Sequence, residues 1–235
     1  MLDPLEIVAL VDLTSLTGEE TEAEIAALCE QAQTPAGPVA AVCVYGQYVT
    51  RAVAELEGSG IRVAAVANFP EGDLDTERAV RETEQAVQDG AREIDVVLPW
   101  QAFAAGDRAG AMAMVEATRE ACPVLLKVIL ESGRLHEPET IGAAARDALA
   151  VGADFVKTST GKVQPAATLP AAAVMLEAVR DHGMGGFKAS GGIRTAEEAA
   201  EYLELADALF GGEWATSRTF RFGASSLLAD LLRER

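Results

Sequence analysis

Three of the four lysines in this chain lie inside short apolar runs, where lysine is least expected. Lys127, Lys157 and Lys188 each interrupt a segment of the kind that forms a buried strand. An unpaired buried ammonium is costly, so such a lysine must be paired, hydrogen-bonded or deprotonated. A deprotonated lysine is a nucleophile toward carbonyl carbons. If these lysines were chance remnants in an arginine-rich sequence, they would be scattered over helix surfaces. Because they are not, the pattern predicts a chemical role for at least one of them.

Two carboxylates stand at equivalent places in the pattern. Asp12 and Asp95 fall, like the three lysines, in the later half of a predicted strand. If all five side chains point inward, they share one cavity, where desolvation and like charge lower the pKa of a lysine. Moving a lysine pKa from about 10.4 to near 7 takes about 4–5 kcal/mol, much of which a nearby ammonium could supply. A structural ion cluster is the alternative, but it accounts for one lysine and not for three.

These side chains must be positioned by a repeating arrangement of strands and helices. Short apolar runs alternate with amphipathic stretches along the whole chain, and four successive strands start about thirty residues apart. Eight strands are predicted: Ile7–Leu13, Ala40–Tyr45, Arg62–Asn68, Glu93–Leu98, Leu125–Glu131, Phe155–Thr158, Gly186–Ser190 and Ala208–Phe210. Eight strand–helix units in 235 residues indicate an α/β fold, a (β/α)8 TIM barrel that forms one domain over residues 1–235. A doubly wound open sheet is the alternative, but no Gly-x-Gly-x-x-Gly follows the first strand.

Helix signals in the sequence fit the same arrangement. Thr17-Gly18-Glu19-Glu20 and Thr195-Ala196-Glu197-Glu198 are predicted to form capping boxes at helix starts. Pro138 suits the first turn of the helix that leads to Gly152.

A second set of residues predicts a phosphate site. Gly191-Gly192 precedes the capped helix at Thr195, and Gly223-Ala224-Ser225-Ser226 precedes the predicted helix Leu227–Leu232. Glycine loops that lead into helix N-termini offer backbone N–H groups and a favourable dipole to an anion. Barrels frequently bind phosphate after their seventh and eighth strands. Ordinary turns are the alternative explanation for each loop taken alone.

Composition narrows the possible partners and the compartment. A net charge of −18 should repel nucleic acid and anionic membranes, so local basic groups must capture any anionic substrate. Three dispersed cysteines, no signal peptide and no run long enough to span a membrane suggest a protein of the reducing cytoplasm. His136 and His182 are far apart and have no partner four residues away, so no metal site is predicted.

The chain resembles the deoxyribose-phosphate aldolase family along nearly its whole length. Asp12-Leu13-Thr14 near the start fits the family, and five longer segments carry the resemblance in order: Glu93–Leu98, Lys127–Glu131, Phe155–Lys162, Lys188–Thr195 and Arg221–Ser226. The resemblance implies a class I aldolase on a (β/α)8 barrel that works without metal or organic cofactor. Such an enzyme reversibly cleaves 2-deoxy-D-ribose 5-phosphate into D-glyceraldehyde 3-phosphate and acetaldehyde through a lysine Schiff base.

The resemblance also implies roles for individual residues. Lys157 matches the Schiff-base lysine, Lys188 the second lysine that lowers its pKa, and Asp95 the acid/base carboxylate that works through a water. Asp12, Lys127 and Thr160 match polar residues that line the substrate site. The phosphate-binding positions correspond to Gly161, Lys162, Gly191, Gly192, Ser225 and Ser226.

The chain departs from the family at two places. Gly46-Gln47 stands where members often carry Pro-Arg, which concerns a loop and not the chemistry. Some members end in a longer tail whose tyrosine enters the site, whereas this sequence ends at Arg235. Proton exchange at the enamine carbon is therefore expected either to be slower or to be handled by Asp95 and water alone. A homodimer is one expectation for the oligomeric state. Another Schiff-base or phosphate barrel, such as a transaldolase, and a non-catalytic sugar-phosphate binding protein are the rival functions.

Overall fold

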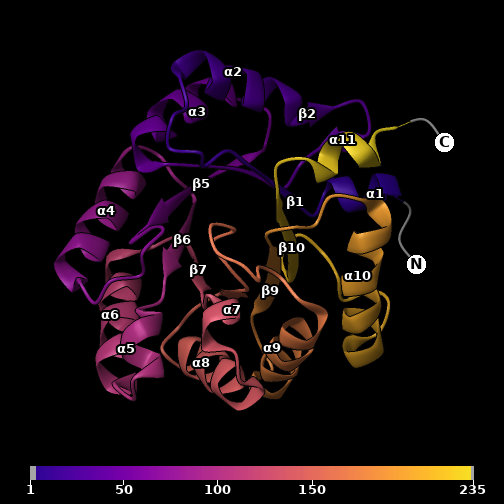
Figure 1. The fold of residues 1–235 in the computed structure, drawn as a ribbon. Coiled ribbons are helices and arrows are strands. Elements are labelled where there is room, and N and C mark those ends of the chain that lie inside the picture. The colour runs from indigo at the N-terminus through magenta and orange to yellow at the C-terminus, as the bar shows by residue number, and fades with distance from the viewer. Residues whose placement is uncertain (1–3, 234–235) are drawn as a thin grey trace.

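Eight parallel strands close into a ring, with the helices on its outside (Figure 1). This computed structural model describes residues 4–233. The strands of the ring are β1 Val11–Thr14, β4 Ala41–Val44, β5 Arg62–Ala67, β6 Glu93–Val97, β7 Leu125–Ile129, β8 Phe155–Lys157, β9 Gly186–Ser190 and β10 Phe220–Ala224. They pair in the order β1-β10-β9-β8-β7-β6-β5-β4, and β4 pairs with β1 to complete the barrel. The predicted barrel is confirmed, and the open doubly wound sheet is excluded.

The remaining elements surround or cap this ring. A short hairpin is formed by β2 Gln33–Thr34 and β3 Gly37–Pro38. The helices are α1 Pro4–Val8, α2 Glu22–Gln31, η1 Gly46–Tyr48, α3 Val49–Glu55, α4 Thr76–Gln88, α5 Trp100–Ala104, α6 Arg108–Ala121, α7 Ser132–Leu135, α8 Pro138–Ala150, α9 Leu169–His182, α10 Ala196–Phe210 and α11 Leu227–Leu231. Within residues 4–233, no helix combines the length and apolar character needed to cross a membrane.

Side chains along each strand point alternately into the barrel and outward to the layer between strands and helices. In β6, Ile94 and Val96 point outward and join the large apolar layer between strands and helices. Glu93, Asp95 and Val97 take the opposite phase and point into the barrel. Since neighbouring strands are in register, an inward residue on one strand lies beside an inward residue on the next. The polar side chains of several strands therefore meet along one axis.

The predicted eighth strand is wrong. Ala208–Phe210 is the last turn of α10, which begins at the confirmed capping box of Thr195 and Glu198 and buries one continuous apolar stripe. The true eighth strand is β10, Phe220–Ala224. Its apolar pattern is interrupted by an arginine and a glycine, so it resembles a loop more than a strand in the sequence.

Two predictions near the N-terminus also need correction. The first strand begins at Val11, because Pro4–Val8 forms α1, which packs against α11 and buries Ile7 and Val8. The capping box that starts α2 is formed by Thr21 and Glu24 and not by Thr17 and Glu20.

Candidate active site

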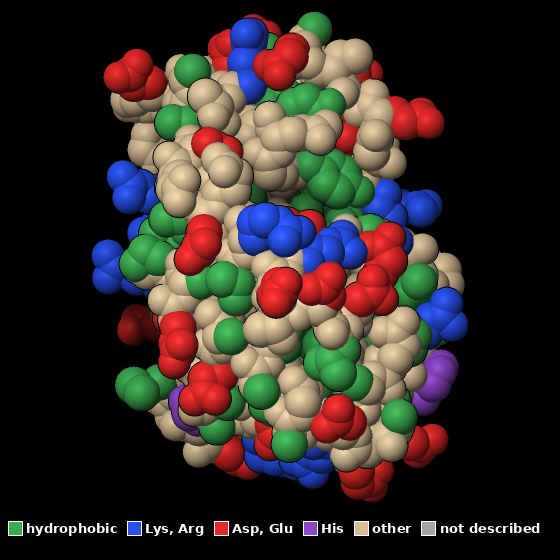
Figure 2. Space-filling model, turned by 90° about the vertical axis from the view of Figure 1, so that its left-hand side faces the viewer, with side chains coloured by type: hydrophobic (Ala, Val, Ile, Leu, Met, Phe, Trp, Pro, Cys, Tyr) green, Lys and Arg blue, Asp and Glu red, His purple; other side chains and the backbone are tan. Residues whose placement is uncertain are grey.

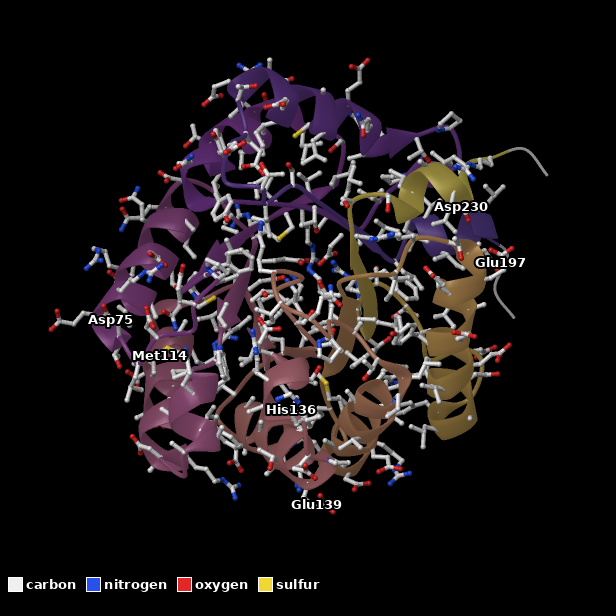
Figure 3. All side chains as sticks on the ribbon, viewed as in Figure 1. Asp75, Met114, His136, Glu139, Glu197 and Asp230 are labelled. Atoms are coloured by element: carbon white, nitrogen blue, oxygen red, sulfur yellow. The ribbon has the colours of Figure 1, made fainter. Side chains whose placement is uncertain are left out.

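The five charged residues singled out in the sequence all lie inside the barrel. Asp12 is in β1, Asp95 in β6, Lys127 in β7, Lys157 at the end of β8, and Lys188 in β9. Register places Asp95 beside Lys127 and Lys157 beside Lys188. All five are buried, and the most exposed, Lys157, is only 2% exposed. Their side chains contact one another inside the barrel. The labelled Asp75 and Glu139, in contrast, point away from the ring at its outer rim (Figure 3).

Asp95 is the hub of this group. Its Oδ2 accepts hydrogen bonds from Lys157 Nζ and from Lys188 Nζ, both at 2.8 Å. Its Oδ1 accepts one from Lys127 Nζ, also at 2.8 Å. Because two ammonium groups contact the same oxygen, the nitrogens of Lys157 and Lys188 are immediate neighbours.

A second layer of charge lies deeper in the barrel and includes two residues that were not predicted. Arg221 of β10 pairs with Asp12 at 2.5 Å and with Glu93 of β6 at 3.0 Å. Glu93 also pairs with Lys127 at 2.5 Å, and Asp12 pairs with Lys188 at 2.5 Å. Both missed residues carry the signal that identified the others. Arg221 interrupts a strand between two phenylalanines, and Glu93 precedes Asp95 by two residues, in the inward phase.

This cluster is one negative charge short of balance when all its members are ionised. Asp12, Glu93 and Asp95 supply three carboxylates, while Lys127, Lys157, Lys188 and Arg221 supply four cations. An excess charge in a dry interior is costly, so loss of one proton is favourable.

The surroundings of the lysines decide which of them loses its proton. Burial lowers the pKa of Lys157, the Lys188 ammonium lowers it further, and Asp95 compensates only in part, so the pKa lies below its usual value. Burial also acts on Lys188, but Asp12 and Asp95 outweigh it and raise that pKa. The pKa of Lys127 is likewise raised, because Asp95, Glu93 and Asp12 outweigh the effect of burial. Lys157 is therefore the group most ready to be a neutral amine, and burial contributes more to this than its neighbour does.

The pKa values of the two carboxylates, Asp95 and Asp12, are both lowered. Although burial alone would raise the pKa of Asp95, the three lysines hold it well below the usual value. The pKa of Asp12 is also lowered, because the charges of Lys188, Arg221 and Lys127 outweigh the effect of burial. Both groups are therefore carboxylates near neutral pH.

A pocket of about 320 Å³ lies above this cluster, at the C-terminal ends of β1, β8, β9 and β10. All six predicted phosphate-binding residues line it, namely Gly161, Lys162, Gly191, Gly192, Ser225 and Ser226, together with Thr14, Thr160, Ser190 and Arg194. Close packing at two of its glycines shows why side chains are excluded. A Cβ on Gly191 would come within 3.0 Å of Gly161 Cα, and one on Gly223 within 2.9 Å of Lys188 Cε.

The face in Figure 2 carries basic side chains grouped near its centre, with acidic side chains around them. A separate hollow of about 470 Å³ is lined by Tyr45, Phe69, Arg78 and Arg81, but by none of the clustered lysines. Among residues 4–233, no group of His, Cys, Asp and Glu side chains has the arrangement of a metal site.

Fold and geometry together place the chain among the (β/α)8-barrel enzymes, which carry their reactive groups at the C-terminal ends of the strands. A family model described as DeoC/LacD family aldolase matches residues 7–233. The chain belongs to this family, and it is an aldolase, a carbon–carbon lyase.

Solved structures agree with this assignment. A protein of Coccidioides immitis that is named as a deoxyribose-phosphate aldolase is 32% identical, with a TM-score of 0.86 over 97% of this chain and 86% of that one. One of Toxoplasma gondii with the same designation is 26% identical, with a TM-score of 0.87 over 97% and 91%. The tetrameric deoxyribose-phosphate aldolase of Aeropyrum pernix is 24% identical and shares the fold, with a TM-score of 0.80 over 97% and 91%.

Proposed function

We propose that this aldolase reversibly cleaves 2-deoxy-D-ribose 5-phosphate into D-glyceraldehyde 3-phosphate and acetaldehyde through an imine on Lys157. The observation that carries the proposal is a buried amine with a lowered pKa that shares one carboxylate oxygen with a second, protonated lysine. Binding alone does not need such an amine, which argues against a passive sugar-phosphate binding protein.

The first half of the reaction forms the imine. Neutral Lys157 attacks C1 of the open-chain sugar, and the resulting carbinolamine loses water to give a protonated imine. Dehydration needs a proton donor beside the departing hydroxyl. Lys188, whose pKa is raised, is protonated and adjacent, and Asp95 can relay the proton with a water molecule.

The second half breaks the carbon–carbon bond. When the C3 hydroxyl loses its proton, C3 becomes a carbonyl carbon, the C2–C3 bond breaks, and its electron pair moves into the imine. Glyceraldehyde 3-phosphate leaves, and the two-carbon enamine on Lys157 is protonated and hydrolysed to acetaldehyde. The protonated imine is the electron sink, so the proposed chemistry needs no metal or organic cofactor.

The position of the cleaved bond follows from the products, because acetaldehyde retains only C1 and C2 of the sugar. A base takes the proton of the C3 hydroxyl, C3 becomes the aldehyde carbon of the three-carbon product, and the C2–C3 electron pair enters the imine. Asp95, a carboxylate near neutral pH, is the base that the site offers, acting through water.

The phosphate pocket supplies orientation in this scheme. We assign the substrate phosphate to Lys162 and to the glycine and serine residues that line the pocket, whose backbone N–H groups and positive charge suit an anion. Holding C1 beside Lys157 can contribute several kcal/mol to catalysis. Thr160 lines the same pocket, whereas Asp12 and Lys127 belong to the fully buried ion cluster.

The test is turnover of 2-deoxy-D-ribose 5-phosphate, followed by reduction of the released acetaldehyde with a coupled dehydrogenase. Wild type should release acetaldehyde, and Lys157→Met should release none while keeping the wild-type melting temperature. Lys162→Met should raise KM more than it lowers kcat. No acetaldehyde from wild type would overturn the proposal.

Two further properties belong to the proposal. We place the protein in the cytoplasm, consistent with three free, buried cysteines, and cell fractionation would test this. We expect at least a homodimer, since the Aeropyrum pernix relative is a tetramer, and analytical ultracentrifugation would test that.

A further inference from the structure

Glu131 is a buried carboxylate that the proposed mechanism does not use. It follows β7, is 1% exposed, and has a left-handed backbone with φ 54° and ψ 53°. Within residues 4–233, only Asn68 and His136 share a positive φ among the residues other than glycine. Glutamate is poorly suited to this conformation, so the surrounding contacts must hold it there.

The side chain of Glu131 holds the turn that borders the phosphate pocket. Its Oε2 accepts a hydrogen bond from Thr160 Oγ1 at 2.6 Å, and the Thr160 N–H approaches both carboxylate oxygens at 3.4 Å. Thr160 Oγ1 in turn accepts a hydrogen bond from the Lys162 N–H at 3.1 Å. Because the Thr160 hydroxyl has only one hydrogen and donates it to Glu131, its lone pairs face the Lys162 N–H and can accept that hydrogen bond.

The backbone around Glu131 supports the same turn. Leu130 N donates to Lys157 O at 2.9 Å, and Ser132 N donates to Thr158 O at 2.8 Å. A Cβ on Gly133 would come within 1.9 Å of Pro165 O, so the segment after β7 packs directly on the loop after β8. Residues 130–133 therefore form a rigid base for the loop that presents Lys162.

The carboxylate form of Glu131 is costly where it stands. Burial raises its pKa, although the hydrogen bonds from Thr160 and the charge of Lys157 act in the other direction. A neutral glutamine of nearly the same shape would avoid this cost. A carboxylate that is kept against burial, in a strained backbone, points to a role beyond stability.

We propose that Glu131 is a positioning residue that fixes the turn Thr160-Gly161-Lys162 at the phosphate pocket and thereby sets the preference for phosphorylated over unphosphorylated sugars. The inference rests on the proposed function. Without the carboxylate, the Thr160 hydroxyl is free to rotate, the turn loosens, and the Lys162 ammonium is spread over more positions. Phosphate binding then weakens more than imine formation does.

The test compares Glu131→Leu, Thr160→Val and the double variant on 2-deoxy-D-ribose 5-phosphate and on 2-deoxy-D-ribose. The ratio of the two kcat/KM values should fall about tenfold in Glu131→Leu, mainly through KM, as for a lost hydrogen bond to a charged group. Thr160→Val should lower it similarly, and the double variant should fall no further, because both changes break the same hydrogen bond between Glu131 and Thr160. Glu139→Leu, an exposed change in α8, is the matched control and should leave the ratio unchanged.

An unchanged ratio in Glu131→Leu, an equal loss on both sugars, or additive losses in the double variant would each overturn the inference. Calorimetric binding of inorganic phosphate provides a comparison that does not depend on turnover. Glu131→Leu should bind phosphate about tenfold more weakly than wild type. If wild type cleaves neither sugar, the proposed function fails, whereas equal phosphate affinities, or no binding by wild type, would refute the role of Glu131 itself.

Discussion

Removing the ammonium beside Lys157 should shift the pH at which that lysine becomes reactive. Lys188→Met takes away a positive charge that shares Asp95 Oδ2 with Lys157. With the two nitrogens about 5 Å apart and an effective dielectric constant of about 20, their repulsion is about 3 kcal/mol. That energy corresponds to about two pKa units, so the neutral fraction of Lys157 near pH 7 should fall about 100-fold.

The assay is the rate at which acetaldehyde and cyanoborohydride modify Lys157, measured across the pH range. In Lys188→Met, the rising limb of the profile should move about two units toward higher pH, and the rate should recover at alkaline pH. Lys127→Met is the matched control, since it removes an equally buried charge that contacts the other oxygen of Asp95. The rising limb of the Lys127→Met profile should move less than that of Lys188→Met.

The alkaline recovery separates an electrostatic effect from a damaged site. A misfolded or misaligned variant would remain slow at every pH. Equal shifts in Lys188→Met and Lys127→Met, or no shift in Lys188→Met, would refute the idea that the neighbouring ammonium tunes Lys157.

Three further outcomes are expected. Arg221→Leu removes a buried cation that pairs with both Asp12 and Glu93 and should lower the free energy of unfolding by about 3–5 kcal/mol in denaturant titrations, whereas the exposed Arg180→Leu should change little. The pKa values of Asp12 and Asp95 are lowered in the folded state, so the stability they contribute is present above about pH 4 and is lost as pH falls further; a melting temperature unchanged on acidification would contradict this. Asp95→Asn should slow deuterium exchange into the methyl group of acetaldehyde, and fast exchange in that variant would show that another group moves the proton.

The barrel was largely predictable because seven of its strands carry an apolar pattern that a local reading of the sequence detects. The eighth strand was not, because the site itself breaks the pattern. Arg221 is in β10 to balance buried carboxylates, and Gly223 is there to leave room for Lys188. The strand that contributes most directly to the site therefore has the weakest strand pattern in the sequence, and the apolar end of α10 fits that pattern better.

The polar cluster was predictable only in part. A charged residue inside an apolar strand is visible in the sequence, which is how Lys157 and Lys188 were found. Glu131 leaves no such signal, since it stands at the end of a strand and its role depends on contact with Thr160, which follows the neighbouring strand β8. The dominance of burial over charge in lowering the pKa of Lys157 also depends on the finished fold.

Trapping the imine is the most direct test of the central claim that Lys157 is the nucleophile. Wild type is incubated with acetaldehyde and borohydride, digested, and mapped by mass spectrometry. A reduced two-carbon adduct on Lys157, with none on the exposed Lys162, is the predicted result. An adduct on Lys127 or Lys188 in its place, or equal labelling of Lys162, would contradict the account.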